Sequence, residues 1–205
     1  MDIVNYYCGS EITVLSPKLE DLTKYISEWD GYNKSHGISS SIRDWEESIE
    51  ELNKKTYSTD PSISNRVSIS FLFEFDSKKF LFLGDSNHSV ISKKLRELGF
   101  SSPKPLEVDF VKLAHHGSKY NISNKLIQMI NCNNFIISSN GRNLYKETLA
   151  RILMNKNRDY TRKITFYFNY PKENYNNLFS EDDLLKYNFT CKYCESNKKQ
   201  INIEL

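Results

Sequence analysis

The sequence lacks any apolar run long enough to cross a bilayer, and its start, Met1-Asp2-Ile3-Val4, lacks the basic and apolar regions of a secretion signal. We therefore expect a cytoplasmic protein with no membrane partner. Only four cysteines occur in 205 residues, too few for a disulfide scaffold, and a reducing compartment would keep them as thiols. The formal net charge of +2 gives no electrostatic case for a nucleic-acid or membrane-surface binder.

The chain length is suited to one domain, residues 1–205, and hydrophobic patterning predicts an α/β fold. Short apolar or alternating runs predict strands at 11–15, 67–75, 79–83, 108–113, 135–138, 163–168 and 200–205. Apolar residues at helical spacing predict helices at 17–29, 42–52, 89–98, 123–130 and 145–154, and another after Ser180. The polar turn at 76–78 predicts that strands 67–75 and 79–83 form a hairpin.

Helix starts are marked by side chains that can cap the first turn. Ser16-Pro17 suits a helix with proline at its first position, and Ser41 with Asp44 has the spacing of a capping box. Ser89 and Ser123 are further candidate caps, and Ser180 with Asp183 forms a second capping-box pattern.

Two of the predicted strands end in residues that can carry chemistry. One is followed by Gly84-Asp85, and the other by Ala114-His115-His116-Gly117-Ser118. Taken alone, Asp85 is explained as well by an ordinary turn as by a role as a hard anionic metal ligand. The histidine pair, in contrast, favours a functional role. Adjacent residues on an extended chain point apart, so one imidazole is expected to face a metal and the other a neighbouring group. Of the remaining histidines, His88 could also reach this site, and His36 is assigned to a polar loop.

These motifs together resemble the C-terminal half of metallo-β-lactamase-fold hydrolases. Those that carry the resemblance are Asn65-x-x-Ser68, Phe80–Asp85, Val108–Ser118 and Phe135–Ser139. The chain is most similar to the hydrolase domain of ComEC/Rec2-type competence proteins and to stand-alone bacterial relatives, over residues 10–140 apart from an insertion. The resemblance implies half of an αββα sandwich with a mixed sheet, a helical insertion at 31–64 and a strand-containing C-terminal extension at 141–205.

The resemblance also implies roles for single residues. Asp85 would bridge two zinc or manganese ions, and His115, or else His116, would be the last histidine ligand. Ser118 and Asn140 would lie near the mouth of the cleft. In such sites the metals lower the pKa of a bridging water and stabilise charge on a phosphoryl oxygen, which implies phosphodiesterase or nuclease-like activity on a phosphodiester or nucleic-acid substrate.

One departure from the family is decisive: the chain contains no His-x-His-x-Asp-His motif, the main metal cradle of these hydrolases. Three interpretations are consistent with a chain that has only half of the fold. It is a truncated hydrolase, one part of a divided enzyme whose partner chain supplies the N-terminal half, or an inactive interaction or assembly module that keeps the fold. The sequence leaves open whether the isolated chain is an enzyme. It predicts exposed apolar surface, and hence a partner chain or self-association.

Two weaker patterns complete the candidates. Cys191-x-x-Cys194 could be half of a zinc site, but no second pair follows at suitable spacing, which favours unligated thiols. Several basic residues after the histidine pair could border a site for an anion, although interspersed acids favour ordinary solvated side chains. They are Lys119, Lys125, Arg142, Lys146 and Arg151.

Overall fold

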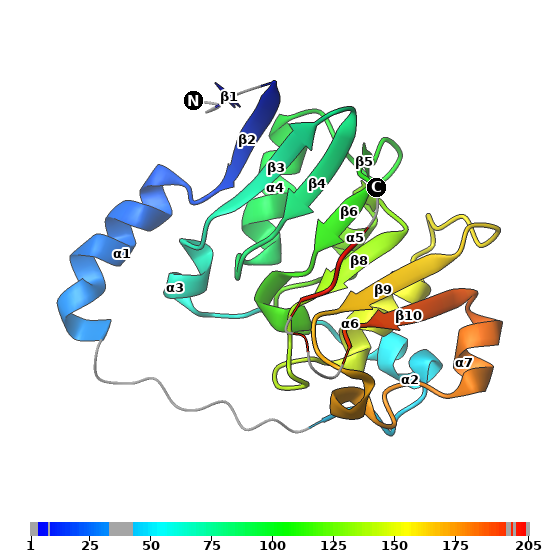
Figure 1. Cartoon of the computed structure of the whole chain (residues 1–205). Coiled ribbons are helices and arrows are strands. Elements are labelled where there is room, and N and C mark those ends of the chain that lie inside the picture. Colours follow the sequence, from blue (N-terminus) through cyan, green and yellow to red (C-terminus); the bar gives the residue numbers. More distant parts are fainter. Residues whose placement is uncertain (1–3, 8, 33–42, 196–197, 199, 204–205) are drawn as a thin grey trace.

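The computed structural model describes residues 4–7, 9–32, 43–195, 198 and 200–203. Across this part of the chain one mixed sheet has eight strands in the order β1-β2-β3-β4-β6-β8-β9-β10, and β5 pairs with β7 in a small separate sheet (Figure 1). Groups of one to three helices are interspersed with single strands or pairs of strands along the chain. The prediction of an α/β fold with a mixed sheet is therefore confirmed.

The strands are β1 (Val4–Tyr7), β2 (Ser10–Ser16), β3 (Ser70–Phe75), β4 (Lys78–Phe82), β5 (Leu106–Glu107), β6 (Phe110–Lys112), β7 (Ile130–Asn131), β8 (Asn134–Ile137), β9 (Ile164–Phe168) and β10 (Phe189–Tyr193). The α-helices are α1 (Leu19–Tyr32), α2 (Ile49–Lys54), α3 (Ile63–Arg66), α4 (His88–Glu97), α5 (Asn124–Ile127), α6 (Lys146–Leu153) and α7 (Glu181–Lys186). Two 3₁₀ turns cover Ala114–Gly117 and Lys172–Tyr175.

Strand direction divides the large sheet into two parts. Strands β1 to β4 pair antiparallel, and the predicted hairpin of β3 and β4 is confirmed, with Phe73 opposite Phe80. From β4 through β6, β8 and β9 to β10 every pairing is parallel. Parallel neighbours end at the same edge of a sheet, so the residues that follow β4 and β6 are brought together there.

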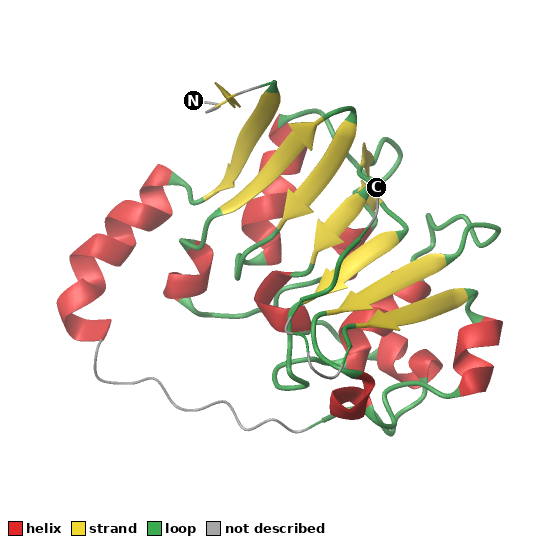
Figure 2. Cartoon of the chain, in the orientation of Figure 1, coloured by secondary structure: helices red, strands yellow, loops and turns green. Residues whose placement is uncertain are grey.

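The two faces of the sheet have different surroundings. Helices α2, α4, α5 and α6 lie on one side of the sheet (Figures 1 and 2). The residues of one register row point to that side and are buried: Leu72, Leu81, Val111, Phe135 and Phe166. The sheet therefore forms the core with a single helical layer.

The opposite face carries a continuous set of phenylalanines, here called the aromatic face: Phe71, Phe73, Phe75, Phe80, Phe82 and Phe110. Their rings stack across neighbouring strands, with centroids 4.8 Å apart for Phe71 and Phe82 and 5.6 Å apart for Phe80 and Phe110. Phe110 is buried, but Phe75 is 50% exposed and the others are half-buried. An apolar sheet face left partly open is suited to contact with another protein surface.

The helix predicted at 42–52 begins later than expected. Ser48, not Ser41, caps α2, and Glu51 closes its capping box. Ser41 and Ile42 lie outside the described residues. Asp44 instead reaches a different helix: its two carboxylate oxygens accept the backbone N–H groups of Lys146 at 2.8 Å and Glu147 at 3.0 Å. The aspartate thus satisfies the first turn of α6 from a segment a hundred residues away in the sequence.

We predict that Asp44→Ala destabilises the protein by about 2 kcal/mol, because two buried N–H groups at the start of α6 lose their acceptor. Asp44→Asn keeps one carbonyl acceptor and should recover part of that loss. Urea denaturation followed by circular dichroism measures both changes. Equal stability of Asp44→Ala and the unchanged protein would show that water replaces the carboxylate without cost.

Other helix and strand ends differ from expectation by local causes. Helix α1 begins at Leu19 rather than at Pro17, and Asn87 rather than Ser89 caps α4. The predicted caps Ser123 and Ser180 are confirmed. Residues 200–203 are not a strand, since they pair with no strand in the described part of the chain. None of the described helices is long and apolar enough to span a membrane.

Candidate functional site

Asp85 and His115 meet at the edge of the sheet where β4 and β6 end. Gly84 makes the bend before Asp85, with a φ of 53°, and a Cβ at this position would collide with the carbonyl oxygen of Ile69 and lie 2.7 Å from Ser68 Oγ. The same Ser68 hydroxyl accepts the N–H of Asp85 at 2.9 Å. The His115 N–H donates to the carbonyl oxygen of Gly84 at 2.9 Å. The two strand ends are thus joined through the backbone.

The histidine pair lies in a tight turn, not on extended chain as predicted. Residues Ala114–Gly117 form a 3₁₀ turn in which His115 and His116 have φ values of 44° and 61°. Two consecutive non-glycine residues in the left-handed region cost of order 1–3 kcal/mol each. Their ring centroids are 6.0 Å apart. The strained turn aims the two imidazoles at different surroundings.

His115 is oriented by a polar network that includes Asp60. Its Nδ1 lies 3.2 Å from Asn121 Oδ1 and 3.8 Å from Asp60 Oδ2. The Asn121 amide donates to Asp60 Oδ2 at 3.1 Å and to the carbonyl oxygen of Asp85 at 3.0 Å. Because Nδ1 faces this network, the other ring nitrogen, Nε2, points away from it. This is the arrangement in which imidazole nitrogens act as metal ligands or bases.

The network changes the pKa of both partners. The neighbouring carboxylate of Asp60 raises the pKa of His115 more than burial lowers it, and the charge of Asp85 raises it further. Burial raises the pKa of Asp60, but the nearby imidazole of His115 and hydrogen bonds from Asn65, Ser62 N–H and Asn121 outweigh it and lower the value to about 2. The pair therefore favours an imidazolium beside a carboxylate.

We predict that Asp60→Asn lowers the pKa of His115 toward its ordinary value, as measured by NMR titration of the ring. The raised pKa of His115 stabilises the folded state below pH 6.5, and this contribution is lost as the pH rises through the folded value. The lowered pKa of Asp60 stabilises it above pH 3.8, and this is lost toward pH 2. Asp60→Asn should therefore lose most stability between pH 3.8 and pH 6.5. Asp76→Asn, in an exposed turn, is the control and should leave the pKa of His115 unchanged.

The described side chains do not complete a hydrolytic metal site by themselves. Such sites use three or more protein ligands, and among the described residues no group of three or more His, Cys, Asp or Glu side chains is placed to hold a metal. Asp60 is the nearest further carboxylate, but both of its oxygens already accept hydrogen bonds, from Ser62 N–H and from the amides of Asn65 and Asn121. Asp85 and His115 remain as two candidate ligands.

Lys112 adds a positive charge to the same site. It is the last residue of β6, its ammonium donates to the carbonyl oxygen of Leu113 at 3.0 Å, and its side chain interacts with the charge of Asp85. Burial lowers the pKa of Lys112, although Asp85 opposes that change. Two carboxylates, one imidazole and one ammonium therefore share the site.

His116 faces a separate cavity with Asn140. Its Nδ1 donates to the carbonyl oxygen of Ser138, and it lines a cavity of about 260 Å³ together with residues of the loop after β8. Ser118 is buried in the histidine turn, where its hydroxyl accepts the N–H of Tyr120 at 3.3 Å. The structure thus places Asp85 with His115, and His116 with Asn140.

Sequence reasoning missed Asp60, Asn121 and Lys112. Asp60 precedes Pro61 in a turn-rich segment, which is typical of a structural turn. Asn121 is completely buried with several hydrogen bonds, a feature that a single polar residue in a loop does not reveal. Lys112 lies near the end of the strand predicted at 108–113, close to the histidine pair, and this position could have identified it as a site residue.

The other candidate ligands lie in structural settings. His88 Nδ1 is 2.9 Å from Ser123 Oγ, and its ring packs edge-on against Tyr57. Cys191 lies within β10, and Cys194 donates to the carbonyl oxygen of Lys198 at 3.1 Å. Cys132, Cys191 and Cys194 are free thiols. Cys8 and His36 lie outside the described residues.

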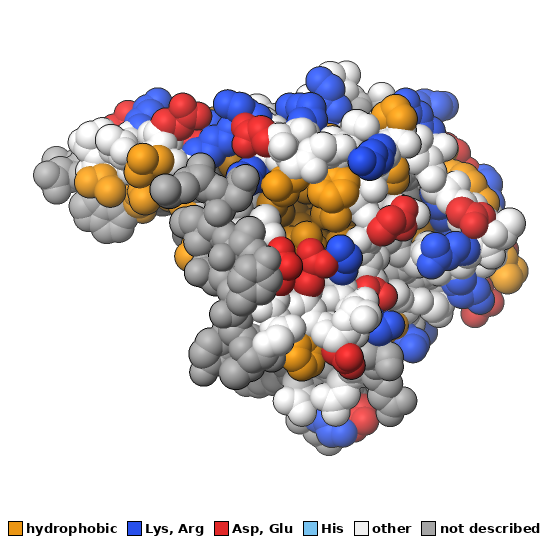
Figure 3. Space-filling view, turned by 90° about the horizontal axis from the view of Figure 1, so that it is seen from above, with side chains coloured by type: hydrophobic (Ala, Val, Ile, Leu, Met, Phe, Trp, Pro, Cys, Tyr) orange, Lys and Arg blue, Asp and Glu red, His pale blue; other side chains and the backbone are white. Residues whose placement is uncertain are grey.

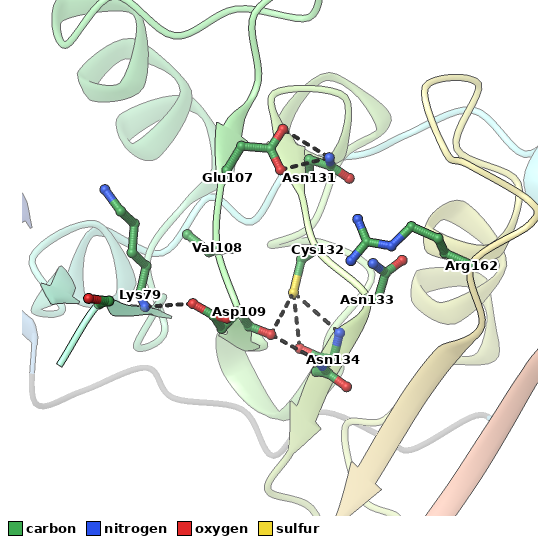
Figure 4. A pocket seen from close by; sticks show the side chains of 10 residues that line it. Lys79, Glu107, Val108, Asp109, Asn131, Cys132, Asn133, Asn134 and Arg162 are labelled. Carbon is green, nitrogen blue, oxygen red and sulfur yellow. Dashed lines mark hydrogen bonds between the residues drawn. The ribbon is translucent and has the colours of Figure 1, made fainter. Parts of the chain in front are cut away.

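A second polar cavity, of about 320 Å³, lies where β6 and β8 begin, at the edge opposite Asp85 (Figure 4). Its polar groups bind one another: the Asn131 amide donates to Glu107, and the Lys79 N–H donates to Asp109 at 2.8 Å. Burial raises the pKa of Cys132 to about 12, so its thiol is unreactive at neutral pH. These contacts indicate a structural role.

Comparison of the chain with protein-family models, curated proteins and solved structures found no match.

Proposed function

We propose that this chain is one part of a divided metal-dependent hydrolase of the metallo-β-lactamase type that acts on phosphodiesters. Asp85 and His115 form one wall of the site, and a second polypeptide supplies the remaining ligands. The observation that carries this proposal is the orientation of His115, whose Nδ1 lies 3.2 Å from Asn121 Oδ1 and faces the Asp60 carboxylate at 3.8 Å, while Nε2 points away from both, beside the end of β4. Carboxylate-oriented imidazoles are characteristic of metal ligands.

The aromatic face supports the divided arrangement. In an αββα sandwich each sheet buries one face against its helices and the other against the second sheet. Here the helical face is covered, whereas the aromatic face keeps Phe75 half exposed and Phe71 and Phe73 partly exposed. Seen from above, hydrophobic side chains also gather in a hollow near the middle of the molecule, between charged groups (Figure 3). The proposed occupant of the aromatic face is the sheet of the second polypeptide.

A second candidate is an inactive assembly module that keeps the sheet for binding a partner. The observation that favours it is the ligand set: two candidate ligands, with the Lys112 ammonium interacting with one of them. An ammonium near Asp85 offsets the negative charge that would attract a dication. Both candidates need a partner on the aromatic face, and they differ in whether the assembled site hydrolyses a substrate.

The activity of the chain with and without its natural partner distinguishes the divided hydrolase from the inactive assembly module. The tagged chain is purified from its own host and, separately, from an unrelated host, and both are assayed on bis(p-nitrophenyl) phosphate with Mn²⁺ or Zn²⁺. We expect turnover only from the first preparation, and loss of that turnover in Asp85→Ala and His115→Ala. His88→Ala is the matched control, because that imidazole lies outside the proposed site and should leave turnover unchanged.

Turnover by the chain from the unrelated host would contradict a divided site. A stable complex without turnover would favour the assembly module. A chain that is monomeric from both sources, by size-exclusion chromatography with light scattering, would contradict both candidates.

A further inference from the structure

A groove between α1, β2 and α4 has no part in the proposed function. Helix α1 runs outward from the end of β2 (Figure 1), and the groove lies where these two elements meet α4. Its volume is about 560 Å³, within the range of about 300–1,000 Å³ that is typical of small-ligand sites. None of the residues that line it belongs to the site of Asp85 and His115. A ligand of this groove is therefore a question separate from hydrolysis.

The walls of the groove are mainly apolar. They are formed by Val14, Leu15, Pro17, Leu19 and Leu22. Leu15 is buried at the base, whereas Leu19 at the rim is 80% exposed. An apolar ligand in the groove would remove this surface from water, which is favourable. The walls are therefore suited to a hydrocarbon chain.

Both helical walls of the groove are fixed by contacts outside it. Helix α1 is tied to α3, because Arg66 donates from Nε and Nη2 to Asp21 Oδ1 at 3.0 Å and 2.9 Å. Helix α4 is anchored by Ile91 and Leu95, which are buried in the core. The groove is thus formed before a ligand enters, which lowers the entropic cost of binding.

Two ammonium groups meet at this groove. Lys18, just before α1, and Lys93 of α4 lie within hydrogen-bonding reach of each other. Burial lowers the pKa of Lys18, and the contact with Lys93 lowers it further, against the opposing charges of Glu97 and Glu20. Among the residues that the structure describes, neither ammonium forms an ion pair with a carboxylate, whereas Lys94 Nζ lies 4.0 Å from Glu97. An anion between the two ammonium groups would relieve their repulsion.

We propose that this groove binds a long-chain fatty acid, with its carboxylate between Lys18 and Lys93 and its hydrocarbon chain along the apolar walls. Three lysines and one glutamate line the groove, so its charge is complementary to an anion. A carboxylate offers one oxygen to each ammonium, and such charge-assisted hydrogen bonds are stronger than neutral ones. The volume is that of a site for one small ligand, which favours a single chain over a lipid with two chains.

Competition with a fluorescent fatty acid, dansyl-undecanoic acid, tests the anionic end of the site. The purified chain is titrated with dodecanoate, below its micellar concentration, and with dodecanol, which has the same chain and no charge. We expect dodecanoate to bind at least about tenfold more tightly, because it gains charge-assisted hydrogen bonds. This preference should disappear in the double variant Lys18→Met with Lys93→Met. Lys104→Met, at an exposed lysine outside the groove, is the matched control and should retain it.

A second pair of variants tests the apolar walls. Leu22→Asn should weaken the binding of dodecanoate and dodecanol to a similar extent, by about tenfold, because both ligands lose the same apolar contact. Phe75→Asn, on the aromatic face, should leave both affinities unchanged, since Phe75 does not line the groove. Thermal melting of each variant separates lost binding from lost folding.

Absence of binding by the unchanged chain, or equal affinity for dodecanoate and dodecanol, would overturn the proposal. A loss of binding in Phe75→Asn but not in Leu22→Asn would place the chain on the aromatic face and also overturn it. Tighter binding of dodecyl phosphate than of dodecanoate, with the same dependence on the two lysines, would overturn the choice of a carboxylate. None of these results changes the proposed function, because the two sites share no residue.

Discussion

Gly84→Ala is expected to destabilise the protein by roughly 3–5 kcal/mol. The glycine has a φ of 53°, and an added Cβ would collide with the Ile69 carbonyl oxygen and press on Ser68 Oγ. The left-handed backbone alone costs an alanine roughly 1–2 kcal/mol, and the collision with backbone adds to that. Asp85 follows directly, so the substitution should also displace the proposed ligand.

Gly99→Ala is the control for backbone conformation without a collision. Gly99 has a φ of 88°, and a Cβ there meets nothing within 4 Å. We expect a loss of about 1 kcal/mol for this variant. Urea denaturation of the two variants separates the cost of the left-handed backbone from the cost of the collision. Similar losses in both would show that the strand end relaxes around a methyl group and that Asp85 is not rigidly positioned.

Arg151→Met is expected to cost about 3–5 kcal/mol, because it leaves a buried carboxylate without its main counter-ion. Arg151 is 2% exposed, pairs with Glu147 and donates to the carbonyl oxygens of Lys119 and Ile122, each at 2.7 Å. Lys119 Nζ, 3.5 Å from Glu147, remains as a weaker partner. Burial lowers the pKa of Arg151, opposed by the charge of Glu147, which is consistent with a guanidinium that needs its partner.

The double variant Arg151→Met with Glu147→Leu should recover most of the loss, because apolar residues of similar size replace the whole pair. Chemical denaturation of the two single variants and the double variant gives the coupling energy. Additive losses would contradict the assignment of Glu147 as the residue that Arg151 stabilises.

The prediction of ordinary solvated basic residues was wrong for Arg151 and Lys146, since both are buried.

The sequence predicted the parts of the fold that depend on local pattern. Alternating apolar residues at 67–75 and the polar turn at 76–78 were sufficient to predict the β3–β4 hairpin. Ser180 with Asp183 was sufficient to predict the start of α7. The pattern could not show that Asp44 caps α6, because that contact joins residues a hundred positions apart. The helix predicted from Ile42 begins at Ile49 instead, with Ser48 as its cap, while Ser41 lies outside the described residues.

The candidate site shows the same division. Asp85 and His115 were recognisable because each follows an apolar strand, and parallel pairing of β4 and β6 brings their ends together. Asp60 was not recognisable, because its role depends on its approach to His115 across the fold rather than on its Asp-Pro neighbours. The left-handed turn of the histidine pair also lacks a sequence signal, since only a few per cent of non-glycine residues adopt a positive φ, even though histidine is among the types enriched there.

The most direct test of the proposed wall is a Zn²⁺ titration of the chain labelled with ¹⁵N-histidine, with ring nitrogens observed by NMR. We predict that Nε2 of His115 shifts selectively and weakly, because two ligands are fewer than a hydrolytic site needs. The shift should persist in His116→Gln and disappear in Asp85→Asn. No selective change at His115, or an unchanged response in Asp85→Asn, would contradict the claim that these two residues form one wall of a metal site.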